Sequence, residues 1–175
     1  MRFKKYDKVM IETAMLWAKE SYCKRAQVGA VLAKGGRIIS NGYNGMPAGS
    51  TNNNGPDNCC EEETLRCQKC NARFNENNFN IDGKCPHCGN KVSKGTKTRK
   101  DVIHAEMNAI LFAARNGIKT EGCTMYVTLS PCIECAKGIV QAGISRVVYN
   151  SDYRKSEGIN FLIKNGIEVQ NIKEK

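Results

Sequence analysis

Cysteine spacing is the feature that most constrains what this chain of 175 residues can fold into. Six of its ten cysteines form three C-x-x-C pairs, which are Cys67–Cys70, Cys85–Cys88 and Cys132–Cys135. Cysteines at this spacing are typical zinc ligands of intracellular proteins, whereas disulfide frameworks belong mainly to small secreted domains. The spacing therefore favours metal sites over disulfides and predicts a cytoplasmic protein.

Hydropathy and the N-terminal segment agree with that location. No apolar run approaches the ~20 residues that a membrane-spanning helix needs. Residues 1–17 contain neither the uninterrupted apolar core nor the cleavage site of a secretory signal peptide. The net charge of +10 favours binding of phosphates, either on a free nucleotide or on a polymer. The basic excess lies outside residues 101–150, where the charges balance.

Hydrophobic periodicity predicts helices and strands in alternation on both sides of a cysteine-rich stretch. The expected helices are residues 6–20, 104–116, 130–143 and 156–166, and the expected strands are residues 27–33, 37–44, 123–129, 145–150 and 167–172. Ser130 and Ser156 stand at predicted N-caps, and a glycine follows each of the last three helices. The apolar face of the first helix is expected to carry Val9, Thr13, Leu16 and Trp17. This alternation implies a layered α/β fold with a mixed sheet.

Residues 50–100 differ from the rest of the chain and predict an insertion rather than core. They are poor in aliphatic side chains, rich in Asn, Lys and Gly, and hold six of the ten cysteines. Within a single domain of residues 1–175, we expect residues 59–95 to form a zinc-ribbon-like module. Metal would supply its folding energy through four ligands, which are Cys67, Cys70, Cys85 and Cys88.

Parts of this insertion leave alternatives open. His87 lies inside the second cysteine pair, where a surface position is expected and a ligand role is the alternative. The basic residues 91–100 predict a solvated linker, with a phosphate contact as the alternative. Cys23, Cys59 and Cys60 could converge, but adjacent cysteines rarely bind one zinc ion together, and no fourth ligand is evident. The sequence therefore predicts at least two zinc ions without assigning these three thiols.

A histidine, a glutamate and the last C-x-x-C pair carry the chemistry. His104 and Glu106 open one predicted helix, and Cys132 and Cys135 open the next. Two thiolates and one imidazole make three zinc ligands and leave the fourth tetrahedral position open, as in catalytic sites. Glu106 is close enough to move protons without binding the metal. The alternatives are a closed site with a fourth protein ligand and a glutamate that only favours its helix start.

The order His-Ala-Glu followed by Pro-Cys-Ile-Glu-Cys matches the signature of zinc deaminases. With "NGYNGMPAG", "HAEMNAI", "GCTMYVTLSPCIECAKGIVQAGI" and "VVYNSDYRKSEG", the chain resembles the cytidine deaminase superfamily and, within it, the deoxycytidylate (dCMP) deaminases. The likeness covers residues 6–50 and 101–171. It implies a three-layer α/β/α fold with a five-stranded mixed sheet. It also implies zinc-dependent hydrolysis of dCMP to dUMP and ammonia, which supplies dUMP for thymidylate synthesis.

The resemblance implies roles for individual residues. His104, Cys132 and Cys135 would hold the catalytic Zn2+, and Glu106 would be the catalytic proton shuttle. The substrate-binding residues would be Val28, Ala30, Asn44, Ala105, Ser130 and Tyr153. The backbone near Val28 and Ala30 would line the base. The Asn44 side chain would reach the sugar, and Tyr153 would lie near the phosphate. By residue type alone, the asparagine could instead be a turn residue and the tyrosine a loop aromatic.

Assembly and regulation are also implied by resemblance. Family members are homo-oligomers, most often hexamers, and Arg115 would lie near an oligomer or effector contact. They are activated by dCTP and inhibited by dTTP, so a nucleotide effector with Mg2+ is expected to bind. The changed insertion leaves this response open.

Two other functions share the same zinc motifs. One is a deaminase that also accepts dCTP, and the other is a polynucleotide deaminase that modifies cytosine or adenine in RNA or single-stranded DNA. Residues 50–100 contain only Phe74 and Phe79 as aromatic residues, which gives little surface for stacking bases. A small-molecule nucleotide is therefore the expected partner, and nucleic acid is not.

Overall fold

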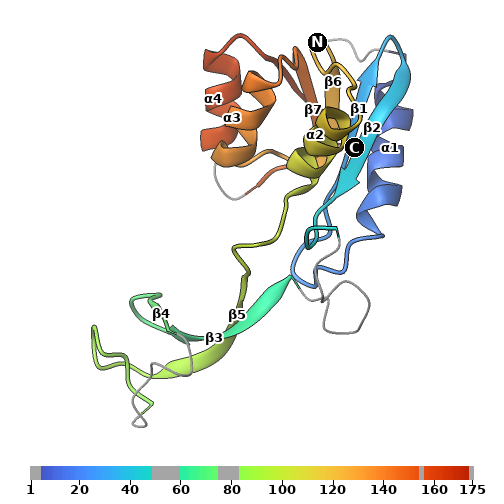
Figure 1. Ribbon diagram of the computed structural model, residues 1–175. Coiled ribbons are helices and arrows are strands. Elements are labelled where there is room, and N and C mark those ends of the chain that lie inside the picture. Colours follow the sequence, from blue (N-terminus) through green and yellow to red (C-terminus); the bar gives the residue numbers. More distant parts are fainter. Residues whose placement is uncertain (1–4, 49–59, 75–82, 154–155, 174–175) are drawn as a thin grey trace.

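The computed structural model describes residues 5–48, 60–74, 83–153 and 156–173. Its main sheet has five strands in the order β2-β1-β6-β7-β8 (Figure 1). The strands are β1 Gly29–Lys34, β2 Arg37–Tyr43, β6 Thr124–Leu129, β7 Arg146–Ser151 and β8 Glu168–Asn171. β1 is antiparallel to β2 and β6, whereas β6, β7 and β8 run parallel. The expected five-stranded mixed sheet is thereby confirmed.

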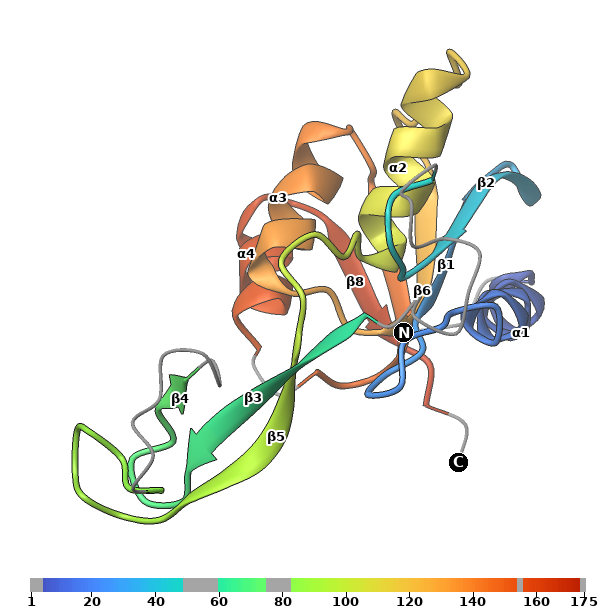
Figure 2. The ribbon, with the colours of Figure 1, turned by 60° about the horizontal axis from the view of Figure 1, so that its bottom comes forward.

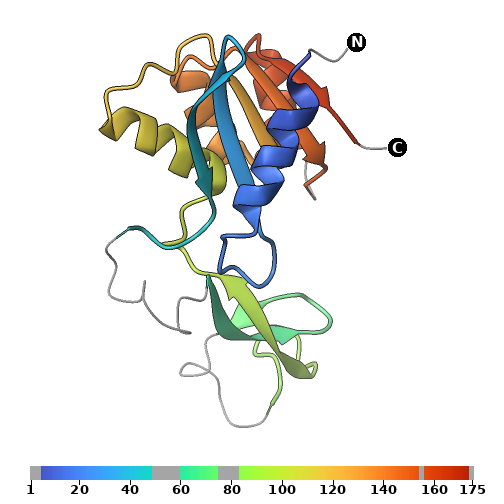
Figure 3. The ribbon, with the colours of Figure 1, turned by 90° about the vertical axis from the view of Figure 1, so that its right-hand side faces the viewer.

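Helices cover both faces of this sheet. Helix α1 lies on one face, as Figure 3 shows, and α2, α3 and α4 lie on the other. Their bounds are α1 Asp7–Ala18, α2 Ala105–Arg115, α3 Ile133–Gln141 and α4 Glu157–Lys164. In β1, Val31 packs with α1 and Leu32 with the opposite layer. Because both faces are covered, this strand is apolar throughout rather than alternating.

The predicted apolar face of α1 is wrong for Val9 and Leu16, whereas Trp17 does pack against the core cluster. Val9 and Leu16 are 50% and 60% exposed, and the buried apolar residues of the helix are Met10, Ile11, Ala14 and Ala18. The small residues let the helix backbone approach β1 closely. A Cβ added at Gly29 would lie only 2.0 Å from the Ala14 carbonyl oxygen. Close backbone packing, which a count of apolar residues does not measure, therefore decides which face is buried.

The predicted start of α3 is also wrong. The helix begins at Ile133 with Cys132 at the N-cap, not at Ser130. The Ser130 hydroxyl instead accepts a hydrogen bond of 2.7 Å from the Tyr153 amide. Ser156 does stand at the N-cap of α4, but its side chain makes no capping hydrogen bond.

A buried ion pair joins α1 to the sheet. Arg146 on β7 is 1% exposed and donates to both carboxylate oxygens of Asp7, at 2.7 and 2.8 Å. The Tyr126 hydroxyl donates to the same carboxylate at 3.0 Å, and Gln170 accepts from the guanidinium. Burial and this carboxylate raise the pKa of Tyr126 to about 12. A single network therefore connects the first helix with β6, β7 and the edge strand β8.

The insertion forms a second sheet, which extends away from the main one (Figure 2). Its strands are β3 Glu61–Cys67, β4 Arg73–Phe74 and β5 Val92–Thr98, in the order β4-β3-β5. We call residues 60–74 and 83–98 the insert arm. The basic stretch predicted as a linker is mostly strand β5, because it pairs with β3 along its whole length. Two backbone hydrogen bonds between Gly45 and Ile103 close the insertion beside the main sheet.

No helix within the described ranges is long and apolar enough to cross a membrane.

Candidate active site

Two helix N-termini bring the three predicted metal ligands together. His104 is the N-cap of α2, Cys132 is the N-cap of α3, and Cys135 lies in the first turn of α3. The Nδ1 atom of His104 lies 3.6 Å from the Cys132 sulfur and 3.3 Å from the Cys135 sulfur. Helix α4 packs tightly behind them, because a Cβ at Gly158 would lie 2.0 Å from the Pro131 carbonyl oxygen. The ligands are thus fixed by the packing of three helices.

These three side chains fit a zinc ion. Zn–S and Zn–N bonds of about 2.3 and 2.0 Å place neighbouring ligand atoms roughly 3.5 Å apart in a tetrahedron. A hydrogen bond from Cys135 lowers the pKa of Cys132 to about 3, and the same contact raises the pKa of Cys135. A thiolate is the form that binds metal. Within the described ranges, this cluster has three members and no fourth ligand.

Glu106 lies beside the cluster and is almost fully buried. It is in the first turn of α2, is 4% exposed and borders the same cavity as His104. Burial raises the pKa of its carboxyl group, while the nearby His104 opposes that rise. A carboxyl group with a raised pKa next to a metal site is suited to accept and return protons.

A cavity of about 370 Å³ opens onto these groups, which is large enough for a nucleotide-sized ligand. Its wall contains five of the six predicted substrate-binding residues, which are Val28, Asn44, Ala105, Ser130 and Tyr153. The sixth, Ala30, has no exposed surface and belongs to the hydrophobic core, so its side chain does not reach the cavity. The successive side chains of β1 alternate between the two faces, and that of Ala30 packs in the layer of α2.

Asn44 shapes one wall of the cavity through its side chain. Its Oδ1 accepts a hydrogen bond of 2.7 Å from the Val28 amide, and its Nδ2 donates one of 2.8 Å to the Ala26 carbonyl. The side chain is 9% exposed. Asn44 therefore holds the loop before β1 against the end of β2, which is more than a turn residue requires.

The cavity wall also contains residues that were not predicted from the sequence, among them Arg25, Glu61 and Thr98. Arg25 lies in the loop before β1, and its guanidinium donates to the Thr98 hydroxyl at 3.3 Å. Glu61 and Thr98 belong to the insert arm. Arg25 lies two positions before the predicted strand "QVGAVLA", which contains predicted substrate-binding residues, so its position in the sequence is a signal for a site residue. No sequence pattern links Glu61 or Thr98 to the site, because the insertion was predicted as a separate module.

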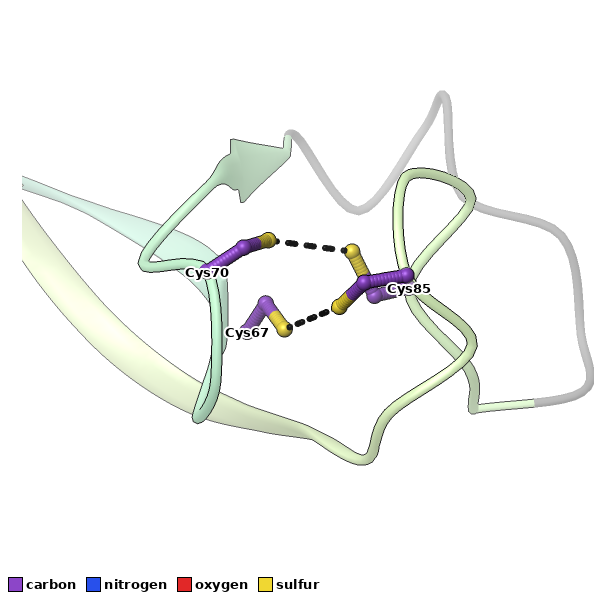
Figure 4. Close-up of side chains that lie close together, drawn as sticks. Cys67, Cys70 and Cys85 are labelled. Carbon is purple, nitrogen blue, oxygen red and sulfur yellow. Dashed lines mark hydrogen bonds between the residues drawn. The ribbon is translucent and has the colours of Figure 1, made fainter.

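The four cysteines of the insert arm also converge. Cys67 lies 3.4 Å from Cys88 and Cys70 lies 3.5 Å from Cys85, measured between sulfur atoms. Figure 4 shows the sulfurs of Cys67 and Cys70 directed toward the second cysteine pair, to which dashed lines join them. These separations suit the four thiolates of a closed tetrahedral zinc site. His87 is exposed and packs edge-on against Phe74, outside this cluster, as expected of a surface residue.

Cys23 and Cys60 form a disulfide, which the sequence did not predict. Both residues are buried, and 37 positions separate them in the chain. The general expectation of metal sites in place of disulfides is wrong for this pair, because the arm base folds back onto the loop before β1. Cys59 lies outside the described residues.

Helix α2 carries an exposed apolar stretch at its C-terminal end. Leu111 and Phe112 are 49% and 52% exposed, and Arg115 beside them is also exposed. Arg115 is not among the residues that line the cavity.

A family model, curated relatives and a solved structure all relate this chain to deoxycytidylate deaminases. Residues 4–151 match the family model described as the cytidine and deoxycytidylate deaminase zinc-binding region. The deoxycytidylate deaminases of Enterobacteria phages T4 and T2 are 43% and 44% identical, over 95% and 93% of this chain and 89% and 90% of theirs. The crystal structure of the dCMP deaminase from cyanophage S-TIM5 in complex with dCMP and dUMP superimposes with a TM-score of 0.71 at 30% identity. That match covers 98% of this chain and 100% of the other.

Proposed function

The chain belongs to the cytidine and deoxycytidylate deaminase family, and on that premise we propose that it hydrolyses dCMP to dUMP and ammonia. It is a zinc-dependent enzyme whose product is the precursor for thymidylate synthesis. The observation that carries this proposal is the convergence of His104, Cys132 and Cys135 beside a buried Glu106 at one cavity. The phage and cyanophage relatives act on dCMP by their names, and they match nearly the whole chain.

The reaction exchanges the amino group on C4 of cytosine for an oxygen from water. Zinc held by His104, Cys132 and Cys135 supplies Lewis-acid chemistry that makes a water molecule nucleophilic near neutral pH. Glu106 takes a proton from water and delivers it to N3, which makes C4 electrophilic. The C4–O bond forms, Glu106 carries the second proton to the amino group, the C4–N bond breaks, and ammonia leaves. Burial keeps this carboxyl group free of competing bulk water.

The remaining cavity residues are proposed to hold the nucleotide. Val28, Ala105 and Asn44 would border the base and sugar, and Ser130 and Tyr153 would lie toward the phosphate. The amide of Tyr153 is already fixed by the Ser130 hydroxyl.

Arg25 is proposed as a further phosphate contact. It is the one lysine or arginine among the described residues that line the cavity, where a monophosphate needs a positive partner. This guanidinium would favour nucleotides over nucleosides.

A substrate comparison tests the function. The purified protein with its bound metal is assayed with dCMP, dCTP, deoxycytidine and a cytosine-containing oligonucleotide, by loss of absorbance. We expect dCMP to be turned over at least about a hundredfold more efficiently than deoxycytidine, the scale of a lost ionic contact to phosphate. Equal efficiencies would remove the phosphate claim. A preference for dCTP, or turnover of the oligonucleotide, would instead support the corresponding alternative function.

We also propose that residues 59–95 are a zinc ribbon within a single deaminase domain of residues 1–175. The four converging cysteines support this module, and so does the location of both hydrophobic clusters of the described residues outside it. The metal would be structural, since four protein ligands leave no open position.

Assembly, regulation and location remain proposals of the same kind. The exposed Leu111 and Phe112 beside Arg115 support a homo-oligomer, with a hexamer as the expected form. Light scattering that gives the 19.4 kDa monomer mass would contradict it. Assays with dCTP or dTTP, with and without Mg2+, test the effector response. We place the enzyme in the cytoplasm because of its cysteine spacing.

A further inference from the structure

The base of the insert arm reaches into the substrate cavity. We propose that Glu61, the first residue of β3, is a positioning residue that holds the loop of residues 21–28 so that Arg25 faces the substrate. This inference rests on the proposed function, in which the guanidinium recognises the phosphate of dCMP. It makes the arm part of the specificity apparatus rather than an appendage.

The Glu61 carboxylate accepts hydrogen bonds from two consecutive backbone amides. Its Oε2 lies 3.1 Å from the Lys24 nitrogen, and its Oε1 lies 3.0 Å from the Arg25 nitrogen. Two consecutive N–H groups directed at one carboxylate fix the orientation of the peptide between them. The backbone from which the Arg25 side chain projects is therefore oriented by the arm.

Further links join the same two segments. Cys60, next to Glu61, forms the disulfide with Cys23, which is two residues before Arg25. The Arg25 guanidinium donates to Thr98, which pairs directly with Glu61 in the β3–β5 register. The arm therefore holds the loop in three ways: the Glu61 side chain accepts from backbone amides of the loop, a disulfide joins the two segments, and Thr98 accepts from the Arg25 side chain.

The main domain holds the ends of this loop but leaves its centre to the arm. Asn44 fixes Ala26 and Val28 at one end, and its carbonyl accepts a 2.7 Å hydrogen bond from the Ser21 hydroxyl at the other. Loss of the Glu61 contacts should thus loosen the centre of the loop while the base-binding end stays in place.

The sign of the charge makes this role testable. A free carboxylate in the cavity wall would repel the phosphate, so its removal would improve dCMP binding. A carboxylate whose two oxygens accept amide protons acts instead through geometry, so its removal should weaken dCMP binding.

The experiment compares Glu61→Gln with Glu62→Gln in the full-length protein. Glutamine offers one acceptor oxygen and turns an N–H2 group toward the other amide. Glu62 is the matched control, because it is the next residue on β3, is exposed, and pairs with Lys97 at 2.9 Å outside the cavity. For Glu61→Gln we expect the KM for dCMP to rise about tenfold, the scale of losing a charge-assisted contact, with kcat within about twofold. The kcat/KM for deoxycytidine should stay unchanged, and Glu62→Gln should behave as wild type.

Two further variants separate the outcomes. Arg25→Gln should raise the KM for dCMP at least as much as Glu61→Gln does. Thr98→Val, which removes the acceptor for Arg25 with little change of shape, should raise it about threefold. Thr98→Val replaces Glu61→Gln as the test if Glu61→Gln loses its zinc or no longer shows a cooperative thermal unfolding transition.

The inference is overturned if Glu61→Gln equals its control, improves dCMP binding, or impairs dCMP and deoxycytidine equally. It is equally overturned if Glu61→Gln does not fold and Thr98→Val binds dCMP as wild type does. If Arg25→Gln abolishes the preference for dCMP and Glu61→Gln does not alter it, only this inference fails. If wild type itself does not prefer dCMP to deoxycytidine, the proposed phosphate recognition fails and this inference fails with it.

Discussion

The two β-sheets of the described residues are held by the same kind of backbone hydrogen bonds but are stabilised in different ways. In the main sheet, five of the six residues of β1 are buried, and helices cover both faces. In the insert arm, β5 has no buried residue, and the buried positions of β3 are Thr64 and Cys67. A small sheet without an apolar core is only marginally stable in water. In the proposed zinc ribbon, metal ligation would stabilise the arm where the main sheet uses hydrophobic burial.

The ion pairs of the two regions also differ in how deeply they are buried. The Asp7–Arg146 pair is buried and hydrogen-bonded to neighbouring strands, whereas the Glu62–Lys97 pair of the arm is partly exposed to solvent. An exposed pair contributes only about 0–1 kcal/mol. Removal of one partner from a buried pair costs several times more. Loss of one charged partner is therefore expected to destabilise the main domain more than the arm.

The largest expected effect concerns the zinc ion that we propose for the arm. Replacement of Cys85 and Cys88 by serine should remove one zinc ion, whose binding supplies on the order of 10 kcal/mol of folding energy. Elemental analysis should fall from two zinc ions to one, and hydrogen exchange should accelerate in residues 60–74 and 83–98 only. His87→Ala is the control and should keep both ions, because this exposed side chain lies outside the cluster. If the cysteine variant loses all its zinc, the two regions fold as one unit.

The next effect is confined to the main domain. Glu106→Gln should lower kcat for dCMP about a thousandfold, or about 4 kcal/mol, because a proton carrier is lost. Zinc content should stay at wild-type level, since Glu106 is not one of the proposed ligands. Glu134→Gln provides the comparison, because this exposed residue also lies in the first turn of a helix at the site and pairs with Lys137. Activity retained in Glu106→Gln would contradict the proposed mechanism.

A pair of leucine truncations compares the two modes of stabilisation. Leu162 on α4 has no exposed surface, so Leu162→Ala should lower the free energy of unfolding by about 2–5 kcal/mol. Leu65 on β3 is only partly buried, and Leu65→Ala should cost less than about 1 kcal/mol. Urea denaturation of both variants measures the difference. Equal losses would mean that the arm contains an apolar core of its own.

The smallest effect depends on pH. The pKa of Tyr126 is raised from 10.0 to about 12, so its contribution to stability is complete below pH 10 and is lost as pH rises through 12. Two pKa units correspond to at most about 2.7 kcal/mol. The difference in unfolding free energy between wild type and Tyr126→Phe should therefore shrink between pH 9 and 12, as followed by urea denaturation. A constant difference across that range would exclude the Tyr126–Asp7 hydrogen bond as its source.

Sequence alone determined the order of the helices and strands outside the insertion, the family and the proximity of the metal ligands. These features depend on local periodicity, on helix-ending glycines such as Gly143 and Gly166, and on short spacings such as Cys132 to Cys135. Such patterns are complete within a few residues, so they can be read before the chain is folded.

Only the tertiary structure decided which face of α1 is buried, where α3 begins, and that the arm base borders the cavity. Each of these depends on contacts between distant segments: Ala14 against Gly29, Ser130 with Tyr153, and Glu61 with the loop at Arg25. The residues involved are small, polar or charged, so hydrophobic periodicity carries no information about their partners. Their positions follow from the close packing of backbones and the need of buried polar groups for hydrogen bonds, which arise only when the layers assemble.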